Sequence, residues 1–212
     1  MNTNDQIEQY KRYRNIAKEY LSHLVTEIDD TRRNYKRIGK LLGVFRENAF
    51  IFEDENESFA FIDFALCEKL YGGRSRVDQE LDSQAELTQE MIEILEAFKD
   101  SYTSLFEIVD KNPEKSTIQL RDLLNGGETE IIDIHFSKLA PVGGLLFCRV
   151  VLLPGFNMNS GVAFGFRGQD KELILRRYRA LSKSKFTIDK SITRFIAFFN
   201  LNRQFGIPVK ML

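Results

Sequence analysis

Hydrophobic and polar positions between Thr103 and Phe166 predict five short strands joined by tight turns. The expected strands are Thr103–Val109, Ser116–Leu124, Glu128–Phe136, Gly144–Leu153 and Val162–Phe166. Strands this short and closely spaced form a small, twisted antiparallel β-sheet or a partly open barrel. We therefore expect residues 103–166 to form the hydrophobic base on which the rest of the chain packs.

The turn between the second and third of these strands is marked by Asn125-Gly126-Gly127, because Asn and Gly readily adopt the positive φ of tight β-turns. A three-residue loop sets Leu124 opposite Glu128 and Ile118 opposite Ile134, which pairs apolar residues on one face. A two-residue loop would place apolar residues against polar ones. The sequence therefore favours the three-residue loop.

Apolar residues at three- and four-residue spacing predict helices before, between and after the strands. The expected helices are residues 5–42, 84–101, 171–182 and 188–205. Asp29-Asp30-Thr31 divides the first of them in two, or else it is a single helix of about 55 Å that would favour a homodimer. Ser83–Glu86 resembles a capping box for the second helix, and Thr187 is the expected cap of the last.

The phenylalanine-rich stretch before residue 71 predicts a β-hairpin region. The expected strands are Val44–Phe45, Phe50–Phe52 and Phe59–Leu66, with an exposed acidic turn at Glu53–Glu57. Asp63 falls among apolar residues, and a buried carboxylate needs a hydrogen-bonding or charged partner.

The fold class expected from these elements is α+β: a small antiparallel sheet or partly open barrel, an N-terminal β-hairpin region, and flanking N-terminal, central and C-terminal helices. Gly72-Gly73 offers a boundary between a part spanning 1–71 and a part spanning 72–212. The alternative is one integrated domain, 1–212. With 43% hydrophobic residues, the chain can bury a substantial core.

Charge is unevenly distributed, although the 212 residues carry a net charge of only −1. Residues 47–100 hold 15 acidic and 4 basic residues, a net charge of −11, and residues 167–212 hold 11 basic and 3 acidic residues, a net charge of +8. The acidic middle and the basic tail are expected to face each other within the fold. The alternatives are that they meet across a homodimer, or that the tail faces an acidic partner.

Several classes of protein and site are disfavoured by the residues present. The two cysteines, Cys67 and Cys148, lie far apart without metal-ligand spacing, which is typical of a reducing cytoplasm rather than of a disulfide framework. No apolar run approaches the roughly 20 residues of a membrane helix, and the polar N-terminus does not resemble a signal peptide. No metal-ligand, phosphate-loop or nucleophile-elbow motif is present, so we expect no metal and no cofactor.

One polar cluster is expected in the strand block. If the turn between the third and fourth strands is symmetric, Arg149 lies diagonal to Asp133 on one face, with His135 nearby. The same pairing turns Cys148 toward the apolar face, which makes it a small buried hydrophobic residue rather than a nucleophile beside His135. We expect an Asp133–Arg149 ion pair.

A basic surface is the other candidate site. Its expected binding residues are Arg167, Lys171, Arg176, Arg177, Arg179, Lys183 and Lys185. The sequence favours a non-enzymatic protein-interaction or scaffold protein with an unidentified protein partner. One alternative is single-stranded RNA or DNA binding through the basic C-terminal helices; another is an enzyme with a carboxylate-based site, which has no readable motif.

Overall fold

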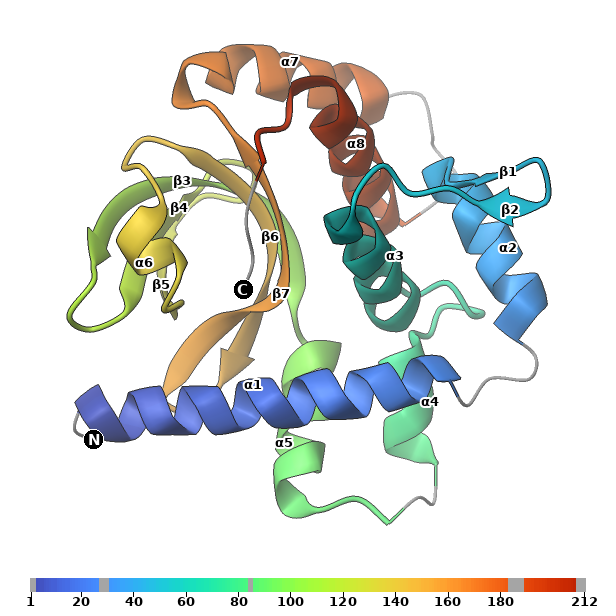
Figure 1. Cartoon of the computed structure of the whole chain (residues 1–212), viewed down its shortest axis with the longest axis horizontal. Helices are drawn as coiled ribbons and strands as arrows, with labels where there is room; N and C mark the ends of the chain where they lie inside the picture. The colour runs from blue at the N-terminus through green and yellow to red at the C-terminus, as the bar shows by residue number, and fades with distance from the viewer. Residues whose placement is uncertain (1–2, 27–30, 84–85, 183–188, 209–212) are drawn as a thin grey trace.

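The computed structural model describes residues 3–26, 31–83, 86–182 and 189–208, and it consists of a small β-barrel with most of its helices packed on one side of it (Figure 1). The expected α+β class is confirmed. The helices of these residues are α1 (Thr3–Thr26), α2 (Thr31–Leu42), α3 (Glu55–Cys67), α4 (Arg76–Asp82), α5 (Gln89–Lys99), α6 (Phe136–Leu139), α7 (Lys171–Ser182) and α8 (Lys190–Phe205). A 3-10 turn, η1 (Gly168–Asp170), precedes α7.

Five strands close the barrel in the order β3-β4-β5-β7-β6. They are β3 (Tyr102–Asn112), β4 (Thr117–Asp122), β5 (Glu128–Ile132), β6 (Leu145–Leu153) and β7 (Phe156–Phe166). Each overlaps an expected strand, although β5 ends at Ile132 and not at Phe136, which begins α6. Neighbouring strands are antiparallel except β5 and β7, which run parallel and share the register pair Ile132 and Met158. β7 begins at Phe156, earlier than expected, and this added length lets it reach β5.

The interior of the barrel is filled with apolar side chains. Alternate residues of each strand point inward. Phe136 of α6 and Ala140, the residue after α6, pack with them. The buried cluster comprises Phe106, Ile108, Ile118, Leu120, Ile131, Phe136, Ala140, Leu146, Cys148, Val150 and Ala163. Cys148 is therefore a buried hydrophobic residue, as the sequence predicted.

The outer surface of β6 and β7 is covered by helices, so the long apolar run of β6 is buried on both faces. Phe147 of β6 stacks on Phe198 of α8 with ring centroids 4.3 Å apart. Phe64 of α3 packs on Phe195 of α8 at 4.8 Å, so residues before and after Gly72 share one core. The division into two parts at Gly72 remains a prediction.

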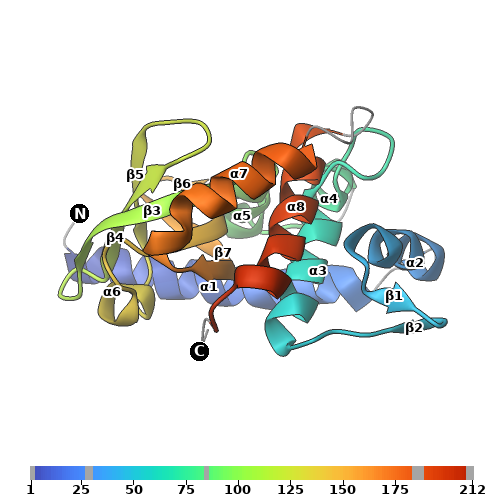
Figure 2. The same ribbon diagram turned by 90° about the horizontal axis from the view of Figure 1, so that it is seen from above.

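A second group of helices, α1, α4 and α5, packs on the other end of β6 and β7. Tyr10 and Tyr13 of α1 contact the ring of Phe156. In Figure 1 α1 runs horizontally across the lower part of the molecule, with α4 and α5 extending below it, and in the view from above it lies behind the other elements (Figure 2). α1 and α2 run in different directions, so the alternative of one long N-terminal helix is wrong; the expected break at residues 29–30 lies outside the described residues.

The third expected N-terminal strand, Phe59–Leu66, is helical and belongs to α3. The hairpin itself exists as β1 (Phe45–Arg46) and β2 (Ala49–Phe50). The Asp54 carboxylate then accepts a hydrogen bond from the backbone N–H of Glu57 and caps α3. A short, continuous apolar run does not distinguish a buried strand from a buried helix, which explains the wrong assignment.

The expected three-residue loop between β4 and β5 is wrong. Arg121 pairs with Glu128 and Ile118 with Ile131, which gives a longer loop. The longer loop is stabilised by the Asp122 carboxylate, which accepts hydrogen bonds from the backbone N–H groups of Leu124 and Asn125.

Helix α5 begins after its cap Thr88, not at the expected capping box, of which residues 84–85 lie outside the described residues. The helix α4 before it was not expected. The C-terminal helices match their predicted ranges closely, although the expected cap Thr187 lies outside the described residues and Asp189 caps α8. Within the described residues no helix has the length and apolar character needed to cross a membrane.

Candidate functional site

The expected polar cluster of Asp133, His135 and Arg149 does not form. β5 ends at Ile132, and one Asp133 oxygen accepts hydrogen bonds from the backbone N–H groups of His135 and Phe136 at the start of α6. The other oxygen accepts a 2.6 Å hydrogen bond from the Asn159 side chain. Asp133 is thus fully engaged in shaping the chain after β5.

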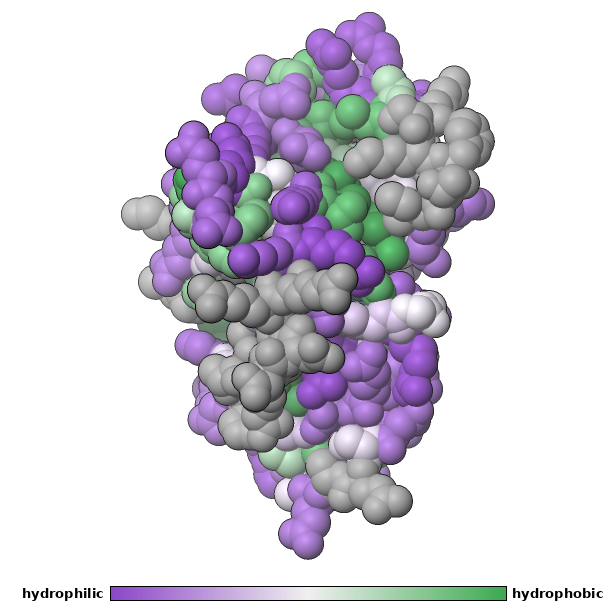
Figure 3. All heavy atoms as spheres, turned by 90° about the vertical axis from the view of Figure 1, so that its right-hand side faces the viewer, coloured by the Kyte–Doolittle hydropathy of each residue, from purple (hydrophilic) through white to green (hydrophobic). Residues whose placement is uncertain are grey.

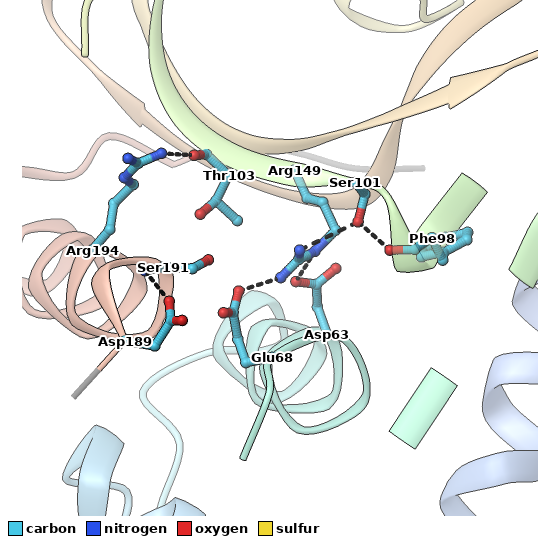
Figure 4. Close-up of polar contacts among 9 residues, drawn as sticks. All are labelled: Asp63, Glu68, Phe98, Ser101, Thr103, Arg149, Asp189, Ser191 and Arg194. Carbon is cyan, nitrogen blue, oxygen red and sulfur yellow. Dashed lines mark hydrogen bonds and ion pairs between the residues drawn. The ribbon is translucent and has the colours of Figure 1, made fainter. Parts of the chain in front are cut away.

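Arg149 points outward from the barrel wall into a buried ion cluster (Figure 4). Its Nε donates to Asp63 at 3.0 Å, and one terminal nitrogen donates to Glu68 at 2.6 Å. The other terminal nitrogen donates to the hydroxyl of Ser101 at 3.3 Å. The expected Asp133–Arg149 pair is therefore wrong, because β5 pairs with β7 rather than with β6 and the symmetric turn does not exist.

The charge of Arg149 is fixed. Burial alone would lower the pKa of Arg149, but Asp63 and Glu68 act more strongly in the opposite direction and raise it. The guanidinium is therefore permanently charged and cannot exchange a proton near neutral pH. Its contacts hold the end of α3 against the barrel, which is a structural role.

A second set of polar contacts joins α8 to the same wall (Figure 4). Arg194 donates to the backbone oxygen of Thr103 at 2.5 Å and to the Asn125 side chain at 3.3 Å. At the start of α8 the Asp189 carboxylate accepts a hydrogen bond from the N–H of Ser191. The buried Thr103 hydroxyl has no hydrogen-bond partner in the described residues. The contacts of Arg194 therefore hold α8 against β3 and the loop that follows β4.

The cysteines and His135 do not assemble a reactive site. Burial raises the pKa of both thiols, Cys67 and Cys148, which keeps them protonated. His135 is half-buried and lies beside the ring of Phe136. Across the described ranges, no group of three or more histidine, cysteine or acidic side chains is placed to hold a metal ion.

The expected basic residues fall into two groups. Lys171 donates to Glu107 of β3 at 2.9 Å and is therefore paired, and Lys183 and Lys185 lie outside the described residues. Arg167, Arg176, Arg177 and Arg179 are exposed, with no hydrogen-bond or ion-pair partner in the part of the chain that is described. Every other arginine whose side chain is described has such a partner. We call these four residues the arginine face.

The arginine face results from the periodicity of α7. Ile174 and Leu175 are buried, and Tyr178 stacks on Phe198 of α8 at 5.0 Å. With 3.6 residues per turn, the opposite side of the helix presents Arg176 and Arg179 to solvent. Figure 2 shows α7 on the outside of the molecule, above α8 and the barrel.

The barrel wall beside α7 is polar and carries both basic and acidic side chains. Arg121 of β4 lies 3.8 Å from Glu107 and 3.0 Å from Glu128. The strands β4 and β5 contain no aromatic residue. This wall therefore lacks the aromatic platform on which single-stranded nucleic acid stacks.

A hydrophobic area lies on another side of the molecule. Phe50, Ile51 and Phe59, from β2, the residue after it and α3, are 39%, 46% and 45% exposed. Figure 3 shows hydrophobic atoms in a hollow between hydrophilic ones on the face that carries these elements.

The acidic middle of the chain is neutralised mostly by segments other than α7. Arg203 of α8 makes a bidentate contact with Glu57 at 2.5 and 2.8 Å, and Arg12 of α1 pairs with Glu90 at 2.8 Å.

The sequence indicated that a buried Asp63 needs a partner, and Arg149 is that partner. It did not indicate that Glu68 would join the same ion cluster.

Comparison with known proteins gives a family but no characterised relative. No curated protein and no solved structure matches the chain significantly. A family model described as a family of unknown function, DUF7986, matches residues 4–212. That match covers the barrel and all the helices around it except the first residue of α1. The chain therefore belongs to the DUF7986 family.

Proposed function

We propose that this protein is a non-enzymatic interaction protein that docks a macromolecular partner on the arginine face. The observation that carries the proposal is that, among the described residues, the arginines of this face have no hydrogen-bond or ion-pair partner. The molecule pairs its other described arginines, including the buried Arg149 and the half-buried Arg203, but leaves Arg167 before η1 and the arginines of α7 exposed. Arginine is enriched in protein interfaces because its guanidinium binds carboxylates through two parallel hydrogen bonds.

The interior of the molecule supports a scaffold rather than a catalyst. Among the described residues, the interior of the barrel is filled by its own apolar side chains, as is usual for small barrels. The ion cluster around Arg149 is engaged by α3 and Ser101. A rigid core that presents one helix outward is suited to binding.

A cytoplasmic location is part of this proposal. Cys67 and Cys148 are free thiols in the structure, and Cys148 is enclosed in the barrel. Free, buried thiols are typical of proteins kept in a reducing compartment.

The test compares two charge-reversed variants of the full chain. The first variant replaces Arg176, Arg177 and Arg179 with Glu. The matched control replaces the exposed Lys69, Lys99 and Lys115 with Glu. Both change net charge equally, but only the first alters α7. We expect the molecules that copurify with the wild-type chain from cells to be lost from the α7 variant and retained by the control. Equal retention by both variants would overturn the proposal.

A further inference from the structure

Resting on the proposed docking role of α7, we propose that the partner is an acidic amphipathic helix of another protein, and not a nucleic acid. The inference depends on what accompanies the arginines on the surface of α7. Three features decide the class of partner: the number of unpaired charges, the leucines between them, and the carboxylates beside them.

The charge and length of α7 match those of a short partner helix that carries acidic residues. α7 has 12 residues, so it is ~18 Å long at 1.5 Å per residue. Arg176 and Arg179 are three residues apart and lie on one face, where two carboxylates one turn apart on a partner helix can reach both. Affinity for nucleic acid comes largely from the number of phosphates neutralised, and the four arginines of this face can neutralise only a few.

Leucines lie beside the arginines. Leu173, Arg177 and Leu181 are four residues apart and form a stripe along α7. Leu181 is 40% exposed, and Leu173 is half-buried. Buried leucine stabilises a protein–protein contact by removing apolar area from water, whereas a phosphate backbone offers no apolar surface in return. This pattern of exposed leucine and arginine therefore favours an amphipathic helix.

Carboxylates beside α7 oppose a phosphate backbone. Glu172 is exposed one turn before Arg176, and Glu107 already binds Lys171 at the start of the helix. Glu128 lies nearby on the barrel wall through its contact with Arg121, which also lies 3.8 Å from Glu107. Each would repel a polyanion, but a helix with discrete charges can place a basic residue opposite Glu172 and acidic residues opposite the arginines.

The test measures binding of labelled probes to the full chain at about 0.15 M salt. The probes are a designed Glu/Leu amphipathic helix of about three heptads, a peptide of the same composition in scrambled order, a single-stranded RNA and a duplex DNA. We expect the amphipathic peptide to bind at least about tenfold more tightly than the scrambled peptide and than either nucleic acid, a difference of ~1.4 kcal/mol or more.

The variants separate charge from packing. Replacing Arg176, Arg177 and Arg179 with Glu should weaken peptide binding by at least about tenfold. Leu181→Ser, which changes no charge, should weaken it severalfold, and the Lys69, Lys99 and Lys115 control should leave it unchanged. Far-ultraviolet circular dichroism and thermal melting show whether each variant remains folded.

The outcomes distinguish this inference from the docking role on which it rests. Tighter binding of RNA or DNA, lost in the α7 variant, would overturn the acidic helix and retain the docking surface. Equal binding of the two peptides, or no effect of Leu181→Ser, would overturn the amphipathic partner. If no probe binding depends on the three arginines, both the inference and the docking role of the arginine face are overturned.

Discussion

The contrast between Arg149 and the arginine face shows how residue environment determines role. Arg149 is 3% exposed and holds two carboxylates that are themselves buried. A buried charge without a partner is strongly destabilising, so each member of this cluster depends on the others. An arginine on α7 is exposed to solvent and contributes little to the stability of the fold, so it is available to bind a partner.

Arg149→Met should therefore destabilise the fold by about 3–5 kcal/mol, because Asp63 and Glu68 lose their counter-charge inside the structure. Arg121→Met is the matched control, since Arg121 pairs with two glutamates on the exposed barrel wall and should contribute at most about 1 kcal/mol. Urea denaturation of both variants measures the difference. Similar midpoints for the two would show that the buried cluster is not needed for stability.

A pH dependence follows from Glu57. Burial alone would raise the pKa of Glu57, but hydrogen bonds from Arg203 and from the backbone N–H of Glu53 lower it below its ordinary value of 4.5. Ionised Glu57 therefore stabilises the fold above about pH 4.5, and the contribution is lost as the pH falls through the lowered pKa of the folded state.

Glu57→Gln should consequently reduce the free energy of unfolding near neutral pH, and this effect should shrink as the pH falls below about 4.5 and through the lowered pKa of the folded state, because Glu57 then becomes protonated in both states. Denaturation curves recorded from neutral pH down through this acid range test this. Glu114→Gln, an exposed site in the β3–β4 turn, should show no such convergence. A gap between wild type and Glu57→Gln that stays constant with pH would contradict the assignment.

At the scale of elements, the start of α3 is fixed by a side-chain cap. Asp54 is its N-cap, with a carboxylate oxygen 2.8 Å from the N–H of Glu57. Asp54→Ala should cost about 1 kcal/mol, and Asp54→Asn, which keeps the oxygen, should cost much less. Thermal unfolding of the two variants separates them, and equal melting temperatures would argue against a capping role.

The elements that could be predicted are those whose pattern has one interpretation. The strands of the barrel alternate or are flanked by glycine turns, and α7 and α8 have a clear helical period, so these elements were found. The run Phe59–Leu66 fits a buried strand as well as a helix, and the capping role of Asp54 decides between them.

The candidate site was harder to predict because it depends on register. The loop after Asp122 is longer than expected, and β7 rather than β6 lies next to β5, so the expected diagonal between Asp133 and Arg149 does not arise. Arginines on α7 were identifiable from composition. That these arginines have no partner among the described residues could not be predicted. It depends on the fold, in which arginines of α1, β6 and α8 pair with acidic residues of the middle of the chain.

At the scale of the whole molecule, the junction between β5 and β7 closes the barrel and ties it to α1. The two strands share one backbone register pair, and side chains complete the junction. Fully buried Asn159 donates to Asp133, and its side-chain oxygen accepts from Arg14 of α1 at 2.9 Å. One amide therefore connects the N-terminal helix, β7 and the start of α6.

Asn159→Ala should loosen this junction, because it leaves the Asp133 oxygen and the Arg14 guanidinium without these partners inside the structure. An unsatisfied buried group costs about 1–3 kcal/mol, and more when it is charged. Hydrogen–deuterium exchange should therefore become faster in β5 and in the middle of α1, while β3 and the helix α8 stay protected.

The matched control is Asn157→Ala. Asn157 also bridges the junction, through a 3.0 Å hydrogen bond to the backbone oxygen of Glu130, but it is half-exposed and water can replace that bond. If the barrel is held closed by the buried network, the Asn159 change will accelerate exchange in β5 far more than the Asn157 change. If the two variants exchange alike, closure depends on the backbone pairing and on the packed interior, and α1 is not coupled to the barrel through Asn159.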